Sequence, residues 1–146
     1  MSLLKSNCII LKEFNLLIEC HSGNLNLQSY VDFVKRTSHD PLFSKILNYF
    51  IDLSDVVVTV SLDDVEKYNN FTIDNFKWEK KKKVALITET PNQMVFATLF
   101  KNSNMQKLKE IEVFSTKENA LEWLNSSFDK NEIFSVLSNL RGHSLK

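Results

Sequence analysis

The sequence predicts a mixed α/β domain with a mainly parallel sheet, and three observations support this fold class. Short apolar runs alternate with amphipathic helical patterns along most of the 146 residues, which is typical of strands joined by helical crossovers. Only 2 Gly and 2 Pro are present, which leaves little room for long linkers. Aromatic residues make up 11% of the chain and include 11 Phe, enough for one core without a disulfide or a metal.

The first part of the chain predicts a strand pair followed by a helix. Apolar runs at 7–11 and 16–20 are separated by polar residues, as in an antiparallel hairpin. Residues 25–37 then predict a helix, because apolar side chains recur there at helical spacing. The members of this stripe are Leu27, Tyr30, Val31 and Val34.

The middle of the chain predicts a strand, a short turn and a second helix. The strand covers about 46–53, and the helix begins at Ser61, where Asp64 three residues on completes a capping box. Residues 83–88 predict another buried strand. The following helix is capped by Thr90, carries Pro91 in its first turn and runs to about 101.

The last part of the chain predicts a short strand at 111–114 and a helix through 124, which opens with a second capping box formed by Ser115 and Glu118. We therefore expect one domain over 1–127 and a helical extension over 128–146. The extension has an apolar face, and a helix this short is marginal alone in water. It packs either on its own domain or on a second copy of the chain, through Ile133, Phe134, Val136, Leu137 and Leu140.

This element order, ββαβαβαβα, and several sequence words resemble the STAS domain, the family of bacterial anti-sigma-factor antagonists. They also resemble the uncharacterised bacterial proteins called STAS/SEC14-like or SpoIIAA-like. The matching words are IDLSDV at 51–56, KVALI at 83–87, VFST at 113–116 and ALEWL at 120–124. The resemblance covers about 7–125. It implies a STAS-like (anti-sigma-factor antagonist-like) mixed, mainly parallel sheet with an antiparallel edge strand, covered by about four helices.

The same resemblance implies a regulatory position at the start of the second helix, where family members carry a phosphorylated serine in an Asp-Ser-Ser-Gly word. In this chain that word falls on 60–63, and the glycine is absent. Asp63 and Asp64 already place negative charge at the helix N-terminus, where they would repel a phosphate. Ser61 is therefore interpreted as a helix cap, with the phosphorylation switch as the alternative. The candidate interaction residues are Ser61, Asp63, Asp64 and Asp55.

Polar residues also gather where the predicted parallel strands end. Ligands of open α/β sheets bind beyond these carboxyl ends, although helix capping alone also explains Ser, Thr and Asp here. The acidic content favours a hydroxyl-rich or cationic ligand over a nucleotide. The residues of this edge are Asp55, Thr59, Ser61, Asp63, Thr88, Glu89, Thr90, Ser115 and Thr116.

Charge and composition exclude several function classes. The 18 basic and 18 acidic residues balance, so the basic excess of a nucleic-acid-binding protein is missing. No apolar run reaches the roughly 18 residues of a membrane span. The basic run at 80–83 is interpreted as a solvated loop before a buried strand, and Trp78 beside it as an ordinary partly buried aromatic.

The chemistry-bearing side chains suggest neither a catalytic nor a metal site. A hairpin turn at Lys12 and Glu13 places Cys8 opposite Leu17, so Cys8 and Cys20 are expected as buried thiols of a cytoplasmic protein. The three histidines, His21, His39 and His143, lack zinc-site spacing. A Ser61–His21–Asp52 arrangement lacks a nucleophile-elbow word. We therefore expect no catalytic residue, no metal and no cofactor.

Two function classes remain. The first is a non-enzymatic protein-interaction or regulatory module, as the STAS resemblance implies, acting through 61–68 and a protein partner or a homodimer. The second is a small apolar-ligand or lipid-binding protein, as the SEC14-like resemblance implies. It needs an apolar cavity whose candidate walls are Phe71, Phe76, Phe96 and Phe100. The interaction module ranks first, because aromatic residues at helical spacing more often belong to a core than to a cavity.

Overall fold

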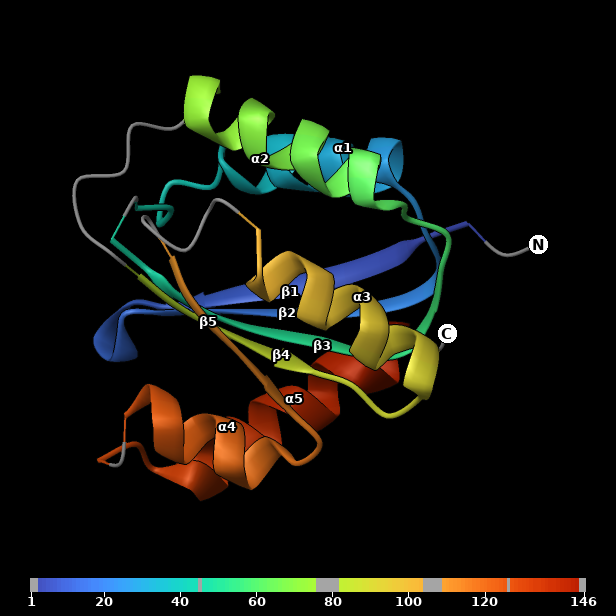
Figure 1. Cartoon of the computed structure of the whole chain (residues 1–146). Helices are drawn as coiled ribbons and strands as arrows, with labels where there is room; N and C mark the ends of the chain where they lie inside the picture. The colour runs from blue at the N-terminus through green and yellow to red at the C-terminus, as the bar shows by residue number, and fades with distance from the viewer. Residues whose placement is uncertain (1–2, 45, 76–81, 104–108, 126, 145–146) are drawn as a thin grey trace.

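The computed structural model describes residues 3–44, 46–75, 82–103, 109–125 and 127–144. Its five strands form one sheet in the order β1-β2-β3-β4-β5, with helices on both faces (Figure 1). The elements, in chain order, are β1 Lys5–Leu11, the 3-10 helix Lys12–Phe14, β2 Leu16–Leu25, α1 Leu27–Thr37, β3 Asn48–Val58, α2 Leu62–Asn75, β4 Lys82–Ile87, α3 Pro91–Lys101, β5 Lys109–Phe114, α4 Lys117–Leu124 and α5 Lys130–Ser144.

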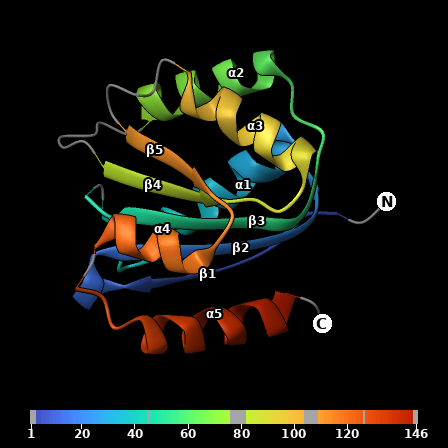
Figure 2. The same ribbon diagram turned by 60° about the horizontal axis from the view of Figure 1, so that its bottom comes forward.

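The sheet is parallel except at one edge, as the sequence predicts. β1 pairs antiparallel with β2, while β3, β4 and β5 each pair parallel with the preceding strand. Because consecutive strands are neighbours, the crossover helices α1, α2 and α3 all lie on one face of the sheet. Figures 1 and 2 show α4 and α5 together on the opposite face. The predicted fold class is confirmed.

Alternation along the strands divides the core between the two faces of the sheet. Towards α4 and α5 the strands present Leu16, Ile18 and Cys20 of β2, Phe50 of β3, and Ala85 and Ile87 of β4. Towards the crossover helices they present Ile51 and Leu53 of β3, Val84 and Leu86 of β4, and Ile111 of β5. The space between the sheet and α1, α2 and α3 also holds the apolar pocket and the buried cluster of ionisable groups described below.

The third strand differs from the prediction, since β3 does not end at Leu53 in a short turn. It continues to Val58 because β2 is also long and supplies a partner for the extra residues, from the Ser22–Asp55 pair to the Leu25–Val58 pair. The extended strand carries Asp55 inside the sheet instead of in a loop.

Two of the three predicted helix caps are correct. The hydroxyl of Ser61 accepts a hydrogen bond from the backbone of Asp64 (3.2 Å), whose carboxylate accepts one from the backbone of Ser61 (3.0 Å). Thr90 caps α3, which begins at Pro91. The prediction for α4 is wrong by one residue.

In α4 the cap is Thr116 and not Ser115. The Thr116 hydroxyl accepts a hydrogen bond from the backbone of Asn119 (3.3 Å), so the predicted Ser115–Glu118 box is replaced by a cap one residue later. Adjacent serine and threonine are both good caps, so the local sequence does not distinguish them.

The hairpin register also differs from the prediction. Cys8 lies opposite Glu19 and not opposite Leu17, and Cys20 lies opposite Asn7. The 3-10 turn before β2 lengthens the connection, which shifts the pairing by two residues. Cys8 and Cys20 do not form a disulfide, and only Cys20 is fully buried.

The basic run is not simply a solvated loop. Lys82 is the first residue of β4 and is only 2% exposed. Lys83 faces the other side of the sheet, where its ammonium donates a hydrogen bond to the carbonyl of Trp123 (3.0 Å). Residues 80 and 81 and Trp78 lie outside the described part of the chain.

The tail helix α5 packs on the sheet of its own chain. Ile133 is fully buried and Leu137 is 2% exposed, and both belong to the core beneath α4 and α5. The side-chain amide of Asn7 on β1 donates a hydrogen bond to the carbonyl of Leu140 (3.2 Å), which ties α5 to the edge strand.

Replacing Leu137 with alanine is expected to lower the free energy of unfolding by about 2–5 kcal/mol, because it removes a buried side chain and leaves a cavity. Urea unfolding followed by circular dichroism measures this loss. Ser135→Ala, at an exposed position of the same helix, is the control and should change stability by less than about 0.5 kcal/mol. A loss that appears only at high protein concentration would contradict packing within one chain.

Candidate functional site

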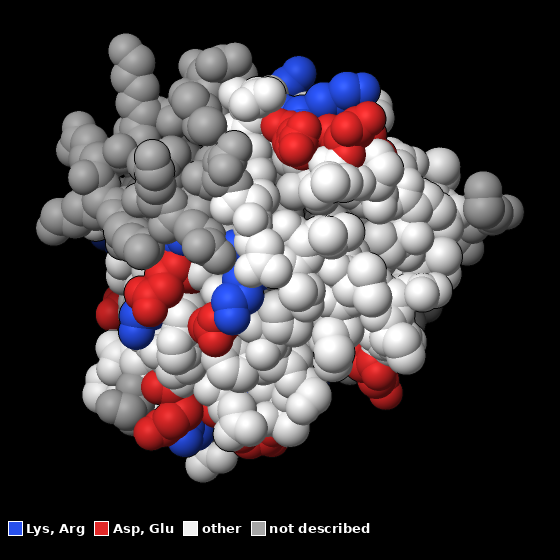
Figure 3. Space-filling model, in the orientation of Figure 1, with Lys and Arg blue, Asp and Glu red and all other residues white. Residues whose placement is uncertain are grey.

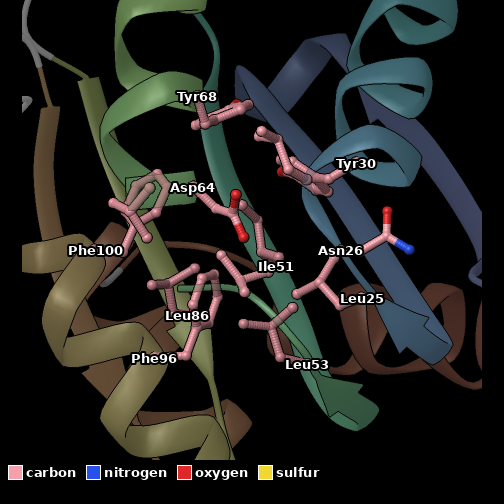
Figure 4. Close-up of a pocket in the computed structure, with 13 residues that line it drawn as sticks. Leu25, Asn26, Tyr30, Ile51, Leu53, Asp64, Tyr68, Leu86, Phe96 and Phe100 are labelled. Carbon is pink, nitrogen blue, oxygen red and sulfur yellow. The ribbon is translucent and has the colours of Figure 1, made fainter. Parts of the chain in front are cut away.

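An apolar pocket lies between the crossover helices and the sheet (Figure 4). Its floor comes from β3 and β4, and its walls from α1, α2 and α3. The cavity volume is about 40 Å³. The lining residues are Leu25, Asn26, Leu27, Tyr30, Ile51, Leu53, Val60, Asp64, Val65, Tyr68, Leu86, Phe96 and Phe100.

Aromatic rings form a continuous wall of this pocket. Tyr30 of α1 and Tyr68 of α2 lie with ring centroids 5.3 Å apart, and Tyr68 and Phe100 of α3 lie 5.8 Å apart. Phe96 is one helical turn before Phe100, at a centroid distance of 6.2 Å. Each ring comes from a different turn or helix, so the pocket exists only where the three helices pack together.

Few polar side chains line the pocket. Asp64 lines the pocket, and its carboxylate is held by the backbone of Ser61, so the cap of α2 also shapes the opening. Asn26, which caps α1, also lines the pocket. Figure 4 shows the Asp64 carboxylate among the apolar side chains that come from β3, α2 and α3.

The size of the pocket limits what it can hold. Sites for drug-sized ligands span about 300–1,000 Å³, whereas this cavity has about 40 Å³. The packed structure therefore has room for a few carbon atoms, such as the end of one apolar side chain, and not for a lipid tail.

The four predicted cavity-wall residues lie in different places. Phe96 and Phe100 line the pocket. Phe71 is outside the lining, where its ring contacts Tyr68 at a centroid distance of 6.4 Å and the ammonium of Lys35 at 5.7 Å. Phe76 lies outside the described residues. The tyrosines Tyr30 and Tyr68 were not predicted as walls, although they lie on the inner sides of the predicted helices.

The four predicted interaction residues do not form one cluster. Ser61 and Asp63 are exposed at the start of α2, and Asp64 turns towards the pocket. Asp55 is half-buried in β3 opposite Ser22. The extension of β3 to Val58 separates Asp55 from the helix start by the last residues of the strand and the connection.

A second, open crevice of about 310 Å³ lies at the carboxyl ends of the parallel strands. Of the nine residues predicted at this edge, four line it: Thr88, Glu89, Ser115 and Thr116. Thr88 is not a cap, and its buried hydroxyl has no hydrogen-bond partner among the described residues. The remaining lining residues are Ser54, Ile87, Lys117 and Glu118.

Beside the apolar pocket lies a buried cluster of ionisable groups that the sequence did not predict. Glu19 of β2 is 1% exposed, and one of its carboxylate oxygens accepts hydrogen bonds from His21 (2.8 Å) and from the hydroxyl of Tyr30 (2.9 Å). Burial, together with the charge of Glu19, raises the pKa of Tyr30 well above its ordinary value. Tyr30 therefore belongs to both the pocket wall and this cluster.

Two lysines lie near this cluster at neighbouring positions in β4 and β5. Burial and the nearby charge of Lys109 lower the pKa of Lys82 from 10.5 to about 7. Burial lowers the pKa of Lys109 to about 8, although the charge of Glu19 opposes this shift. The ammonium of Lys109 lies 5.7 Å from the ring centre of Tyr68 and 5.8 Å from that of Phe100. Strand alternation alone would place apolar residues here, so the local sequence carried no signal for this cluster.

Within the described residues, no group of three or more His, Cys, Asp or Glu side chains is arranged to hold a metal ion. His21, which the sequence left without a partner, is bound to Glu19 and to Ser6. No described helix has both the length and the apolar character needed to cross a membrane.

A five-stranded mixed sheet with one antiparallel edge pair, and with helices on both faces, defines a SpoIIAA-like, or STAS-like, α/β fold. Among solved structures, the chain is similar to an uncharacterized protein of the DUF3478 family with a SpoIIAA-like fold from Shewanella loihica PV-4. The two share 18% sequence identity with a TM-score of 0.56, over 85% of this chain and 97% of that chain. At this identity the likeness shows the fold. No family model and no curated protein matches the chain.

Proposed function

We propose that the protein is a non-enzymatic protein-interaction module, and that its apolar pocket receives one apolar side chain of a partner protein. The observation that carries this proposal is the size of the pocket, about 40 Å³, which matches part of a side chain. Interfaces concentrate their binding energy in a few such anchors, each inserted into a well-packed pocket.

The surface of the helices that enclose the pocket supports this proposal. The sequence of α3 carries no charged residue from Pro91 to Phe100, and Figure 3 shows a broad uncharged area where α3 lies. Met94 and Val95 on α3 are 51% and 60% exposed, and Leu62 at the start of α2 is 51% exposed. Apolar side chains exposed together on a surface mark sites of protein contact.

Ser61, Asp63 and Asp64 keep their proposed interaction role at the start of α2, and Asp55 keeps its own as a separate position in β3. Ser61 and Asp64 hold each other in the cap of α2. A phosphate on Ser61 would displace Asp64 from the cap and change the rim of the pocket, which is how a phosphorylation switch would act here.

A second candidate function is the binding of a small apolar ligand or lipid. It is favoured by the aromatic wall of Tyr30, Tyr68, Phe96 and Phe100. A lipid of ordinary size requires α2 and α3 to move apart, because the packed cavity is several times too small.

Blocking the mouth of the pocket separates these functions. Val60 lines the pocket and is half-buried, so Val60→Trp is expected to fill the opening. Peptides selected from a random displayed library on the wild-type protein should bind this variant about 30-fold more weakly, the loss expected for one anchor of about 2 kcal/mol. Isothermal titration calorimetry measures the affinities.

Val57→Trp is the matched control, because Val57 is 62% exposed and lies outside the pocket. Selected peptides should bind it as they bind the wild type. If the selected peptides bind Val60→Trp as tightly as they bind the wild type, the pocket is not part of the interface. Native mass spectrometry of the purified protein tests the second candidate, since a lipid-sized adduct that Val60→Trp excludes would replace the interaction module with a carrier.

A further inference from the structure

A chain of hydrogen bonds links Ser6 of the edge strand to the buried cluster. The Ser6 hydroxyl lies 2.6 Å from Nδ1 of His21, and Nε2 of His21 lies 2.8 Å from the carboxylate of Glu19. The hydroxyl of Tyr30 donates a hydrogen bond to the same carboxylate oxygen (2.9 Å). The rings of Tyr30 and Phe33 pack against His21 at centroid distances of 5.5 and 4.8 Å, so the imidazole is held in place.

This pattern assigns the protons. A carboxylate only accepts hydrogen bonds, so Nε2 of His21 carries the hydrogen that points to Glu19. In neutral His21 the lone pair of Nδ1 then faces Ser6 and accepts the proton of its hydroxyl. A nucleophile, a base within hydrogen-bond reach and a third group that orients the base together define an activated serine.

We propose that Ser6 is an activated nucleophile that accepts an acyl group from reactive esters. His21 acts as its base, and Glu19 is the positioning residue that stabilises His21 when it takes up the proton. This site is separate from the proposed interaction function and does not depend on it.

The reaction needs no oxidant or cofactor. The Ser6 oxygen attacks the carbonyl carbon of the ester while its proton moves to Nδ1 of His21. The bond from that carbon to the leaving oxygen then breaks, and the leaving oxygen takes the proton from His21. The products are an ester of Ser6 and a free alcohol.

The position of Ser6 allows a reagent to reach it. Ser6 is half-buried on β1, the outermost strand of the described sheet. His21 and Glu19 are only 2% and 1% exposed. The reagent therefore meets the hydroxyl at the sheet edge, while the base and its partner stay shielded from water.

The first test is labelling with an alkyl fluorophosphonate, which reacts with activated serines, followed by intact-protein mass spectrometry and peptide mapping. We expect one adduct per chain, on Ser6, in the folded wild-type protein. Because the Ser6–His21 contact exists only in the fold, labelling in denaturant should be at least about 100-fold slower, the usual size of a general-base contribution. Equal rates in the folded and unfolded protein, an adduct elsewhere or no adduct would overturn the proposal.

Ser6→Ala should abolish the labelling. Ser22→Ala is the matched control, because Ser22 is also half-buried and lies on the neighbouring strand, opposite Lys5. It should label at the wild-type rate. The acyl step is tested with p-nitrophenyl acetate: release of p-nitrophenolate should stop once Ser6 is blocked by the fluorophosphonate. Release that continues unchanged would overturn acyl transfer at Ser6.

Discussion

Replacing Glu19 with alanine is expected to lower the free energy of unfolding by about 2–6 kcal/mol, because two buried hydrogen-bond donors lose their acceptor. The carboxylate is the acceptor for both His21 and Tyr30. Its loss leaves two buried donors without that acceptor, and a buried group left unsatisfied costs about 1–3 kcal/mol. It also removes the negative charge that favours the charged form of Lys109.

Urea unfolding at neutral pH, followed by circular dichroism, measures this effect. Glu110→Ala is the control, because Glu110 is exposed on β5. This substitution should change the free energy of unfolding by less than about 0.5 kcal/mol. In the double variant Glu19→Ala/Tyr30→Phe the losses should not add, since the second change removes one of the orphaned donors. A loss below about 1 kcal/mol for Glu19→Ala would show that water reaches the cluster.

Stability is expected to rise between pH 7 and pH 9, by about 1 kcal/mol per pH unit for each of the two buried lysines that has released its proton. The folded-state pKa values of Lys82 and Lys109 are about 7 and about 8, against 10.5 for an ordinary lysine. Above these values the folded protein has lost protons that the unfolded chain still holds. Stability therefore increases with pH in this window and is independent of these groups well below pH 7.

Other buried groups limit this rise in stability at higher pH. Burial raises the pKa of Cys8 above its ordinary 9.0 and those of Tyr30 and Tyr68 well above their ordinary 10.0. The unfolded chain ionises these side chains first, so they lower stability as the pH rises past about 9–10.

Urea titrations at closely spaced pH values test this prediction. Lys82→Met should flatten the pH dependence and raise stability at pH 7, because it removes the need to desolvate or neutralise an ammonium group. Lys5→Met, at an exposed position of β1, should leave the slope unchanged. A flat profile for the wild type would mean that both lysines keep their ordinary pKa in the folded protein.

Much of the fold was predictable because its signals are local. The Ser61–Asp64 capping box and the Thr90–Pro91 helix start each depend on residues within one turn, and the structure contains both. Where two adjacent residues were equally suitable as a helix cap, the prediction was wrong. Ser115 and Thr116 are both suitable caps, and in the structure Thr116 caps α4.

The candidate sites were predictable only in part. Helical spacing identified Phe96 and Phe100 as inward-facing residues of α3, and both line the pocket. Tyr30 and Tyr68 share the same wall, but they come from different helices. Their proximity depends on how α1 and α2 pack, which periodicity within one helix does not contain.

By itself, the sequence determined which segments form strands and helices, their order along the chain and the parallel arrangement that follows from that order. These properties depend on periodicity, capping and connection length, all of which act between residues close in the chain. Only the tertiary structure decided the hairpin register that places Cys8 opposite Glu19, the pairing of Lys82 with Lys109 and the contact between Ser6 and His21. These features depend on the register between paired strands, and a shift of one residue would have moved each side chain to the other face of the sheet.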